Sequence, residues 1–185
     1  MVNKYQIDKD LIEAFLHSME MDLDFKTYND SKYHEYIYGS AEVVGLMCLK
    51  VFCEGDQAMY ERLREPACKL GAAFQKVNFL RDLAADFKKL GRSYFPGVNV
   101  ESFDQATQLR LIEDIENDLA TSAKTLPLLP MGSRKAVAAA QMFFQALNER
   151  IRNTPAEVLI ETRISVPNSQ KLVILAKALL GVIPK

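Results

Sequence analysis

The sequence predicts an all-α fold. Apolar side chains recur at the three- and four-residue spacing of amphipathic helices through most of the 185 residues. No segment shows the strict alternation of a half-buried strand, and capping residues and prolines separate the periodic stretches. An apolar content of 49% over this length can fill the core of one compact domain, residues 1–185, without a repeat or a linker.

Capping residues and prolines set the order of the first elements. The first helix is expected from a cap at Asp8 to about Phe25, and the second over residues 31–52. The second helix carries few charges past its middle and should be buried. Asp56 opens a short segment that Pro66 ends, and Pro66 should then be the first residue of the next helix, where a missing N–H costs nothing.

The same signals predict the remaining helices. The helix from Pro66 should stop at Gly91, because glycine readily adopts the left-handed conformation found at helix C-termini. A capping box of Ser102 and Gln105 predicts a helix that ends at about Leu126, and a cap at Ser133 predicts one that runs through Arg152. A second capping box begins at Thr154, and the last helix is expected over residues 169–182.

Charge and cysteine content indicate a soluble, cytoplasmic protein. The net charge of −1 is spread evenly and offers no nucleic-acid footprint. Three cysteines in apolar helical patterns fit a reducing compartment. The N-terminus does not resemble a signal peptide. The longest apolar stretch, residues 172–184, contains Lys177 and is too short for a transmembrane segment, which leaves peripheral membrane contact open.

A row of oxygen-bearing side chains lies on one face of the helix predicted over residues 66–90. Gln75, Asn78, Asp82 and Asp86 are three, four and four residues apart, so they fall within roughly a quadrant at about 100° per residue. Amide and carboxylate oxygens suit a hard cation such as Mg²⁺, which also binds substrate phosphates. The spacing therefore makes diphosphate chemistry the first hypothesis.

A simpler interpretation of this helix is an amphipathic helix with a solvated polar face, because an apolar stripe lies opposite the row. Solvated faces usually mix charge signs, whereas Asp82 and Asp86 are like charges that repel at this spacing. Arg81, Lys88 and Arg92 lie beside the row, where they could hold phosphate oxygens. Spacing alone leaves both interpretations open.

The segment AFQKVNFLRDLAADFKKLGRSYFP, residues 73–96, resembles the second aspartate-rich region of the squalene/phytoene synthase family, the head-to-head prenyl synthases. The family pattern is Q-x-x-N-x-x-R-D-x-x-x-D followed by G-R-x-Y-x-P. Segment 36–47 is similar to the family helix Y-x-Y-x-V-A-G-x-V-G, and residues 19–23 and 162–172 also have counterparts. The central pattern is filled by Gln75, Asn78, Arg81, Asp82, Asp86, Gly91, Arg92, Tyr94 and Pro96.

The chain departs from the family at several positions. Ser40 and Glu42 replace the usual Val and Gly, and Phe143 and Phe144 stand where many members have a tyrosine. The family also carries an earlier D-x-x-x-D motif on a facing helix, and nothing before Gln75 matches it. The chain therefore looks like the C-terminal two-thirds of such an enzyme, incomplete relative to the family.

The resemblance implies a fold and an activity. The fold would be an isoprenoid synthase-like bundle of long helices around a central cavity, with the N-terminal helices missing. The activity would be a Mg²⁺-dependent condensation of two farnesyl or geranylgeranyl diphosphates, through a cyclopropylcarbinyl diphosphate, to a squalene- or phytoene-type product. NADPH would be used only if the product is squalene. The prenyl diphosphate would be the main binding partner.

The resemblance also implies roles for particular residues. Metal binding falls to Asn78, Asp82 and Asp86, diphosphate binding to Arg81, Arg92 and Arg163, and the reacting end of the substrate to Tyr36, Gln75 and Tyr94.

The rival interpretation is a non-catalytic helical homologue or an interaction module that keeps the scaffold. Because one aspartate-rich motif is absent, we expect this chain alone to be inactive. Apolar walls built from residues 31–52 and 66–90 would be uncovered if facing helices are missing, so we also expect self-association.

Overall fold

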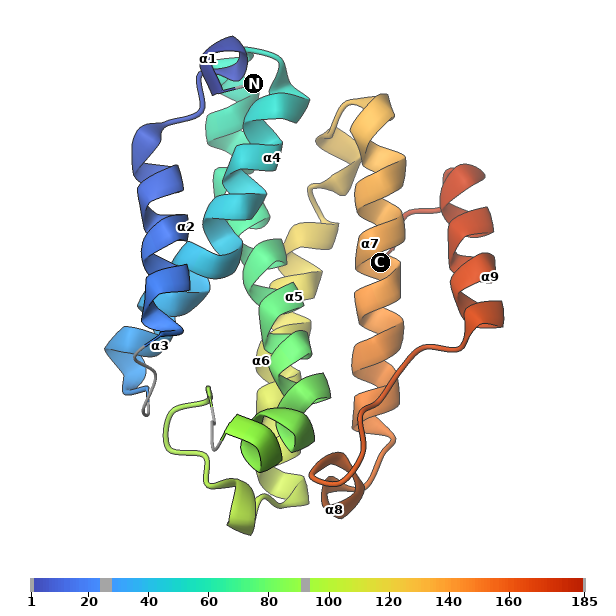
Figure 1. Ribbon diagram of the computed structural model, residues 1–185. Helices are drawn as coiled ribbons and strands as arrows, with labels where there is room; N and C mark the ends of the chain where they lie inside the picture. Colours follow the sequence, from blue (N-terminus) through green and yellow to red (C-terminus); the bar gives the residue numbers. More distant parts are fainter. Residues whose placement is uncertain (1, 24–27, 91–93, 185) are drawn as a thin grey trace.

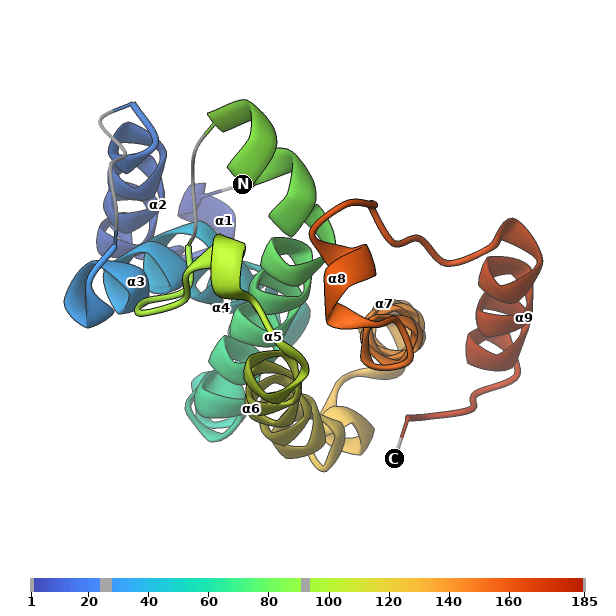
Figure 2. The same cartoon turned by 90° about the horizontal axis from the view of Figure 1, so that it is seen from below.

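The computed structural model describes residues 2–23, 28–90 and 94–184, which form a helical bundle with no strand among them (Figure 1). The predicted all-α class is confirmed. The long helices α5 (Gln57–Leu90) and α6 (Gln105–Ala123) run through the centre. On one side lie α2 (Lys9–Met21), α3 (Asp30–Ile37) and α4 (Val43–Cys53), and on the other α7 (Met131–Arg152) and α9 (Asn168–Leu179), as Figures 1 and 2 show. The shorter elements are α1 (Val2–Tyr5), η1 (Tyr38–Glu42), η2 (Val100–Ser102), η3 (Leu126–Leu128) and α8 (Ala156–Leu159).

Helix α5 is the hub of the bundle, because it contacts α4, α6, α7 and α8. Ala73, Val77 and Leu80 on this helix are completely buried. They belong to the larger of two apolar clusters, which joins α5 to α3, α6, α7 and α8. A second cluster joins α2 and α4 to the first turns of α5 and to η3. The side chains of α5 are therefore held from several directions.

Glycines allow α4 and α5 to approach closely. The helix predicted over residues 31–52 forms, but α3 and α4 are joined through η1, a π-helical turn. A Cβ on Gly71 would lie 2.5 Å from the carbonyl oxygen of Ala41 in this turn, and one on Gly45 would lie 2.7 Å from that of Ala67. Because real Cβ atoms do not approach backbone this closely, these two glycines set the distance between the helices.

The prediction that Pro66 starts a helix is wrong. Helix α5 begins at Gln57 and continues through Pro66 to Leu90. A proline inside a helix removes the hydrogen bond to the carbonyl four residues earlier and usually costs about 3 kcal/mol. Here that carbonyl belongs to Arg62, an exposed residue that water can reach, and packing on both sides of Pro66 holds the helix together.

Several predicted caps are also wrong, whereas Asp56 does accept the N–H of Met59 at 2.9 Å. Asp104, not Ser102, caps α6 by accepting the N–H of Thr107. Ser133 and Thr154 are not caps, because Pro130 and Pro155 occupy the N-cap positions of α7 and α8; their hydroxyls donate to the carbonyls of Pro130 and Arg150. Asp8 occupies the first position before α2 without a side-chain cap. The predicted ends at Phe25 and Gly91 lie outside the described residues.

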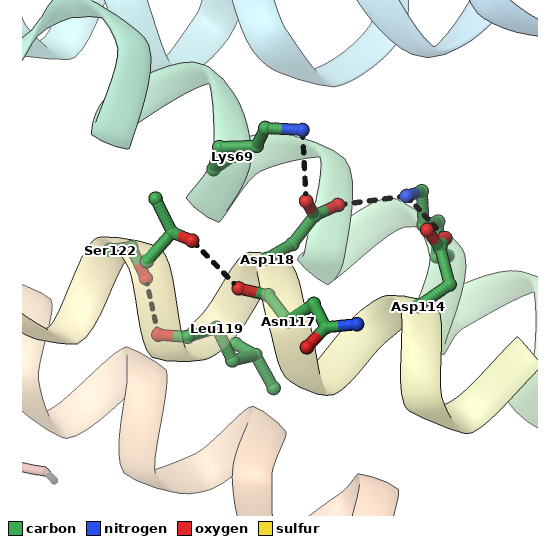
Figure 3. Close-up of polar contacts among 8 residues, drawn as sticks. Lys69, Asp114, Asn117, Asp118, Leu119 and Ser122 are labelled. Carbon is green, nitrogen blue, oxygen red and sulfur yellow. Dashed lines mark hydrogen bonds and ion pairs between the residues drawn. The ribbon is translucent and has the colours of Figure 1, made fainter.

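A buried ionic cluster joins α5 to α6 (Figure 3). Lys76 Nζ lies 2.8 Å from one carboxylate oxygen of Asp118 and 2.5 Å from Asp114, and Lys69 Nζ lies 3.1 Å from the other oxygen of Asp118. The side chains of Lys76 and Asp118 are only 11% and 7% exposed. The cluster satisfies these charges and fixes the register of the two central helices.

One helical run among the described residues, 30–53, is long and apolar enough to cross a membrane by length and composition alone. Core helices of soluble proteins pass the same test. In this run Val43, Leu46, Leu49 and Cys53 are buried in the second apolar cluster, so the bundle itself accounts for part of its apolar character.

We expect Gly71→Ala to destabilise the protein. Alanine improves helix propensity by about 1 kcal/mol, but its Cβ would collide with the Ala41 carbonyl, and such overpacking costs about 1–3 kcal/mol. The matched control is Gly132→Ala in α7, where a Cβ meets nothing within 4 Å. Urea unfolding should show a loss for the first variant and none for the second; equal stability of the two would contradict the close approach.

We expect removal of either partner of the Lys76–Asp118 pair to lower the unfolding free energy by about 1.5–3 kcal/mol, because the remaining buried charge would lose one of its two partners. The variants are Lys76→Met and Asp118→Leu. The double variant should lose less than the sum of the two, since neither charge then remains. The exposed pair of Glu61 and Arg64 supplies a control, because Glu61→Gln should change stability by less than about 0.5 kcal/mol. An Asp118→Leu variant as stable as this control would refute the argument.

Candidate functional site

A cavity of about 510 Å³ lies between η1, α4, α5, α7 and the chain around η3. Its walls are mostly apolar. Helix α4 contributes Val44 and Leu49, α5 contributes Leu70 and Phe74, and α7 contributes Phe144. Phe74 and Phe144 stack across the cavity wall with ring centroids 3.9 Å apart. The cavity can hold an elongated apolar molecule.

Two members of the predicted polar row, Gln75 and Asn78, line this cavity. The Oδ1 atom of Asn78 is buried and has no hydrogen-bond partner among the described residues, and the same holds for Ser40 Oγ on the opposite wall. The solvated-face interpretation therefore does not describe Asn78. A buried, unsatisfied carbonyl oxygen costs about 1–3 kcal/mol, and a ligand atom entering the cavity could remove that cost.

Asp82, one helical turn beyond Asn78, is held by two arginines. Arg163 reaches it from the chain between α8 and α9, with Nε 2.6 Å from Oδ1, and Arg81 contacts both carboxylate oxygens. Burial acts to raise the pKa of Asp82, but the hydrogen bonds and charges of Arg81 and Arg163 outweigh burial and hold the pKa below its ordinary value. Arg81 and Arg163, two residues predicted to bind diphosphate, thus contact Asp82, a residue predicted to bind the metal.

The other predicted residues of this region are placed less fully. Asp86 is half-buried on α5, one turn beyond Asp82. Arg92 lies outside the described residues. Among the described residues, no group of three or more His, Cys, Asp or Glu side chains converges. The oxygen donors of the row are therefore two amides, Gln75 and Asn78, and two carboxylates, Asp82 and Asp86, on a single helix face.

The structure brings Tyr36 and Tyr94 together but separates them from Gln75. Their rings lie 5.4 Å apart in a buried aromatic cluster, where Phe79 of α5 stacks on Tyr94 at 4.2 Å. Neither tyrosine is among the residues that line the cavity. Gln75 lines the cavity, and the expectation that Tyr36, Gln75 and Tyr94 share one end of the site stays a prediction.

Sequence reasoning missed Asp22, which follows α2. The hydroxyl of Tyr36 donates to Asp22 Oδ2 at 3.0 Å, and that of Tyr94 donates to Oδ1 at 3.5 Å. Burial, followed by the nearby charges of Tyr94 and Asp22, raises the pKa of Tyr36 above its ordinary value. Asp22 lies in the segment 19–23, which has a family counterpart, but the two tyrosines that donate to it are 14 and 72 residues away, so spacing gives no signal for these contacts.

Comparison with known proteins gives the same family that the motifs suggested. The family model for squalene/phytoene synthase matches residues 1–170. A 15-cis-phytoene synthase from a Paracoccus species is 33% identical over 178 residues, covering 88% of this chain and 55% of the relative. A 15-cis-phytoene synthase from Enterobacter agglomerans is 29% identical over 170 residues, covering 83% of this chain and 55% of the relative.

A crystal structure of a dehydrosqualene synthase in complex with a ligand has a similar fold. It superposes with a TM-score of 0.76 at 25% sequence identity, covering 94% of this chain and 65% of that one. The chain spans about half the length of the curated relatives it matches.

We expect the Asp82 ion pairs to make stability depend on pH. The folded state favours the carboxylate, so this contribution is present above the ordinary aspartate pKa of 3.8 and is lost as the pH falls through the lower folded-state value. Between about pH 5 and pH 2, the wild type should lose more stability than Asp82→Asn. Arg163→Gln should lose part of the same pH dependence. Parallel stability curves for wild type and Asp82→Asn would contradict this assignment.

Proposed function

The chain belongs to the squalene/phytoene synthase family, and from this premise we propose that it takes part in the head-to-head condensation of two prenyl diphosphates. In this proposal the apolar cavity holds a prenyl chain, and the face of α5 from Gln75 to Asp86 receives a diphosphate. The curated relatives carry the name phytoene synthase, which favours a phytoene-type product over a squalene-type one.

The observation that carries the proposal is the buried Oδ1 of Asn78 at the wall of an apolar cavity. A prenyl diphosphate has an apolar tail and a highly charged head. The cavity offers apolar walls for the tail, and Asn78 lines it. Arg81 and Asp82 follow on α5, and Arg163 reaches Asp82 from the chain between α8 and α9. The apolar tail would therefore lie in the cavity, and the charged head would lie beside the polar residues that follow on α5.

Asn78, Asp82 and Asp86 fit Mg²⁺ by their chemistry, since all three offer oxygen atoms and Asn78 Oδ1 lacks a partner among the described residues. Asn78, Asp82 and Asp86 would hold the ion, directly or through water. When bound, Mg²⁺ would neutralise charge on the departing diphosphate. Arg81 and Arg163 now neutralise Asp82, and their planar guanidinium groups could turn to phosphate oxygens, which they match equally well.

The apolar cavity would protect the reaction from water. Departure of diphosphate from an allylic carbon leaves a carbocation, which water would quench. Leu70, Phe74 and Phe144 exclude water from the wall next to Asn78. Tyr36 and Tyr94 pack with Phe79 in the buried aromatic cluster and are not among the residues that line the cavity, so we assign these tyrosines and Asp22 to holding the shape of the site rather than to contact with the substrate.

We expect the purified chain to bind a prenyl diphosphate but not to turn it over, since no D-x-x-x-D motif precedes Gln75. Calorimetry with geranylgeranyl thiodiphosphate and Mg²⁺ measures binding without turnover. Asn78→Leu should weaken binding about 10–100-fold by removing a polar contact to a charged group. The same variant should be no less stable than wild type, because it removes an unsatisfied carbonyl.

The matched control is Asn117→Leu on the exposed side of α6, which should bind as wild type does. Equal binding by both variants would overturn the placement of the diphosphate end, and absence of binding by the wild type would favour the non-catalytic alternative. Product formation from geranylgeranyl or farnesyl diphosphate would overturn the expected inactivity. Self-association through the walls formed by residues 31–52 and 66–90 stays a prediction, which light scattering over a range of concentrations tests.

A further inference from the structure

The π-helical turn η1 places a serine hydroxyl at the cavity wall without a partner. Ser40 lies in the middle of this turn and lines the cavity, and its Oγ atom is buried with no hydrogen-bond partner among the described residues. A buried hydroxyl without a partner costs stability. The family pattern has valine at this position, where that cost does not arise. The serine therefore lowers the stability of the fold unless a ligand atom satisfies its hydroxyl.

Other hydroxyls of this protein are satisfied locally. A serine or threonine in or beside a helix can donate to a carbonyl oxygen three or four residues earlier, as Figure 3 shows for one serine of α6. Such bonds, of 2.7–3.1 Å, are made by Ser18, Thr121, Ser122, Thr125, Ser133 and Thr154. Ser40 has the same chemistry but no such bond. Its unsatisfied hydroxyl is therefore a property of this position and not of serine in helices.

The backbone on both sides of Ser40 is held in place. A Cβ on Gly39 would lie 2.5 Å from the carbonyl oxygen of Ala14 in α2, and one on Gly71 in α5 would lie 2.5 Å from that of Ala41. The turn is therefore packed between α2 and α5 at the two residues next to Ser40. A shift of the turn that gave the hydroxyl another partner would break these contacts, so the packing keeps Ser40 at the cavity wall.

The hydroxyl lies at the polar part of the cavity. The turn touches the middle of α5, and Tyr36, one helical turn before Ser40, packs on Phe79 with ring centroids 6.0 Å apart. Ser40 therefore lies opposite the stretch of α5 that brings Gln75 and Asn78 to the cavity. The Oδ1 atom of Asn78 can only accept, whereas a serine hydroxyl can donate. This part of a mostly apolar cavity thus offers both an acceptor and a donor.

We propose that Ser40 donates its hydroxyl to an oxygen of the diphosphate, while Asn78 Oδ1 faces the cation that accompanies it; this inference rests on the proposed function. A carbonyl oxygen repels an anionic phosphate oxygen but attracts a cation, whereas a hydroxyl donates to the anion. The two unsatisfied atoms therefore match a diphosphate together with its cation. Glu42, the acidic residue of the same turn, is not among the residues that line the cavity. Valine in place of Ser40 could not make this bond.

Calorimetry on the full chain tests the contact with two probes that share one tail. The first is geranylgeranyl thiodiphosphate with Mg²⁺, and the second is geranylgeraniol, which has no diphosphate. Ser40→Ala should weaken binding of the thiodiphosphate about tenfold, because it removes one hydrogen bond to a charged group, and should leave binding of geranylgeraniol unchanged. Urea unfolding should find this variant no less stable than wild type, because the hydroxyl that it removes is unsatisfied.

The matched control is Thr125→Val, which removes another hydroxyl from a residue that lines the same cavity. The Thr125 hydroxyl already donates to the carbonyl of Ser122 at 3.0 Å. This variant should therefore show the opposite pattern, with lower stability in urea and unchanged binding of the thiodiphosphate.

The outcomes separate this inference from the proposed function. If Ser40→Ala binds the thiodiphosphate as wild type does while Asn78→Leu binds it more weakly, the role of Ser40 is refuted and the proposed function stands. If Ser40→Ala loses as much affinity for geranylgeraniol as for the thiodiphosphate, the hydroxyl does not contact the diphosphate and the inference fails. Absence of thiodiphosphate binding by the wild type would overturn both.

Discussion

The buried ion pair between Lys76 and Asp118 determines which way α5 faces. Lys76 follows Gln75 directly, so their side chains point about 100° apart around the helix. With Lys76 and Lys69 held against α6, Gln75 and Asn78 are directed to the cavity wall formed with α4 and α7. Apolar packing alone would not select this rotation as sharply, since α5 buries apolar residues on several sides. The buried ammonium of Lys76 can reach the Asp118 carboxylate in only one rotation of α5 about its axis.

Close approach between α4 and α5 is the second constraint on the site. Gly45 and Gly71 let the backbone of each helix touch the other, and the π-helical turn at residues 38–42 lies at this contact. The cavity begins beside it, with Ser40, Ala41 and Val44 on one wall and Leu70 and Gly71 on the other. The space for a ligand is thus framed by backbone contacts that side-chain movement cannot readily close.

The sequence predicted the helical class and the polar row because both depend on local spacing. It failed where a distant contact decides the outcome. Pro66 stays inside α5 because tertiary packing outweighs its local cost. The predicted caps failed for a different, local reason: Pro130 and Pro155 occupy the N-cap positions of α7 and α8, and the hydroxyls of Ser133 and Thr154 donate to carbonyls three and four residues earlier. The pairing of Lys76 with Asp118, 42 residues away, and of Asp22 with Tyr36 and Tyr94 leaves no periodic signal, so neither could be read from spacing.

On α5, Lys76 stabilises the fold, whereas Asn78 costs stability in the free protein. At Lys76 the charge is paired, so the residue supports both the fold and the orientation of the site. Two residues later, Asn78 leaves a carbonyl oxygen buried without a partner among the described residues, which costs stability in the free protein. Folding alone would be served by leucine at that position. Under the proposed function, a polar ligand atom would satisfy this oxygen, on a helix whose rotation the Lys76–Asp118 ion pair fixes. In that proposal the position of Asn78, more than the number of carboxylates, marks where the head of the ligand would lie.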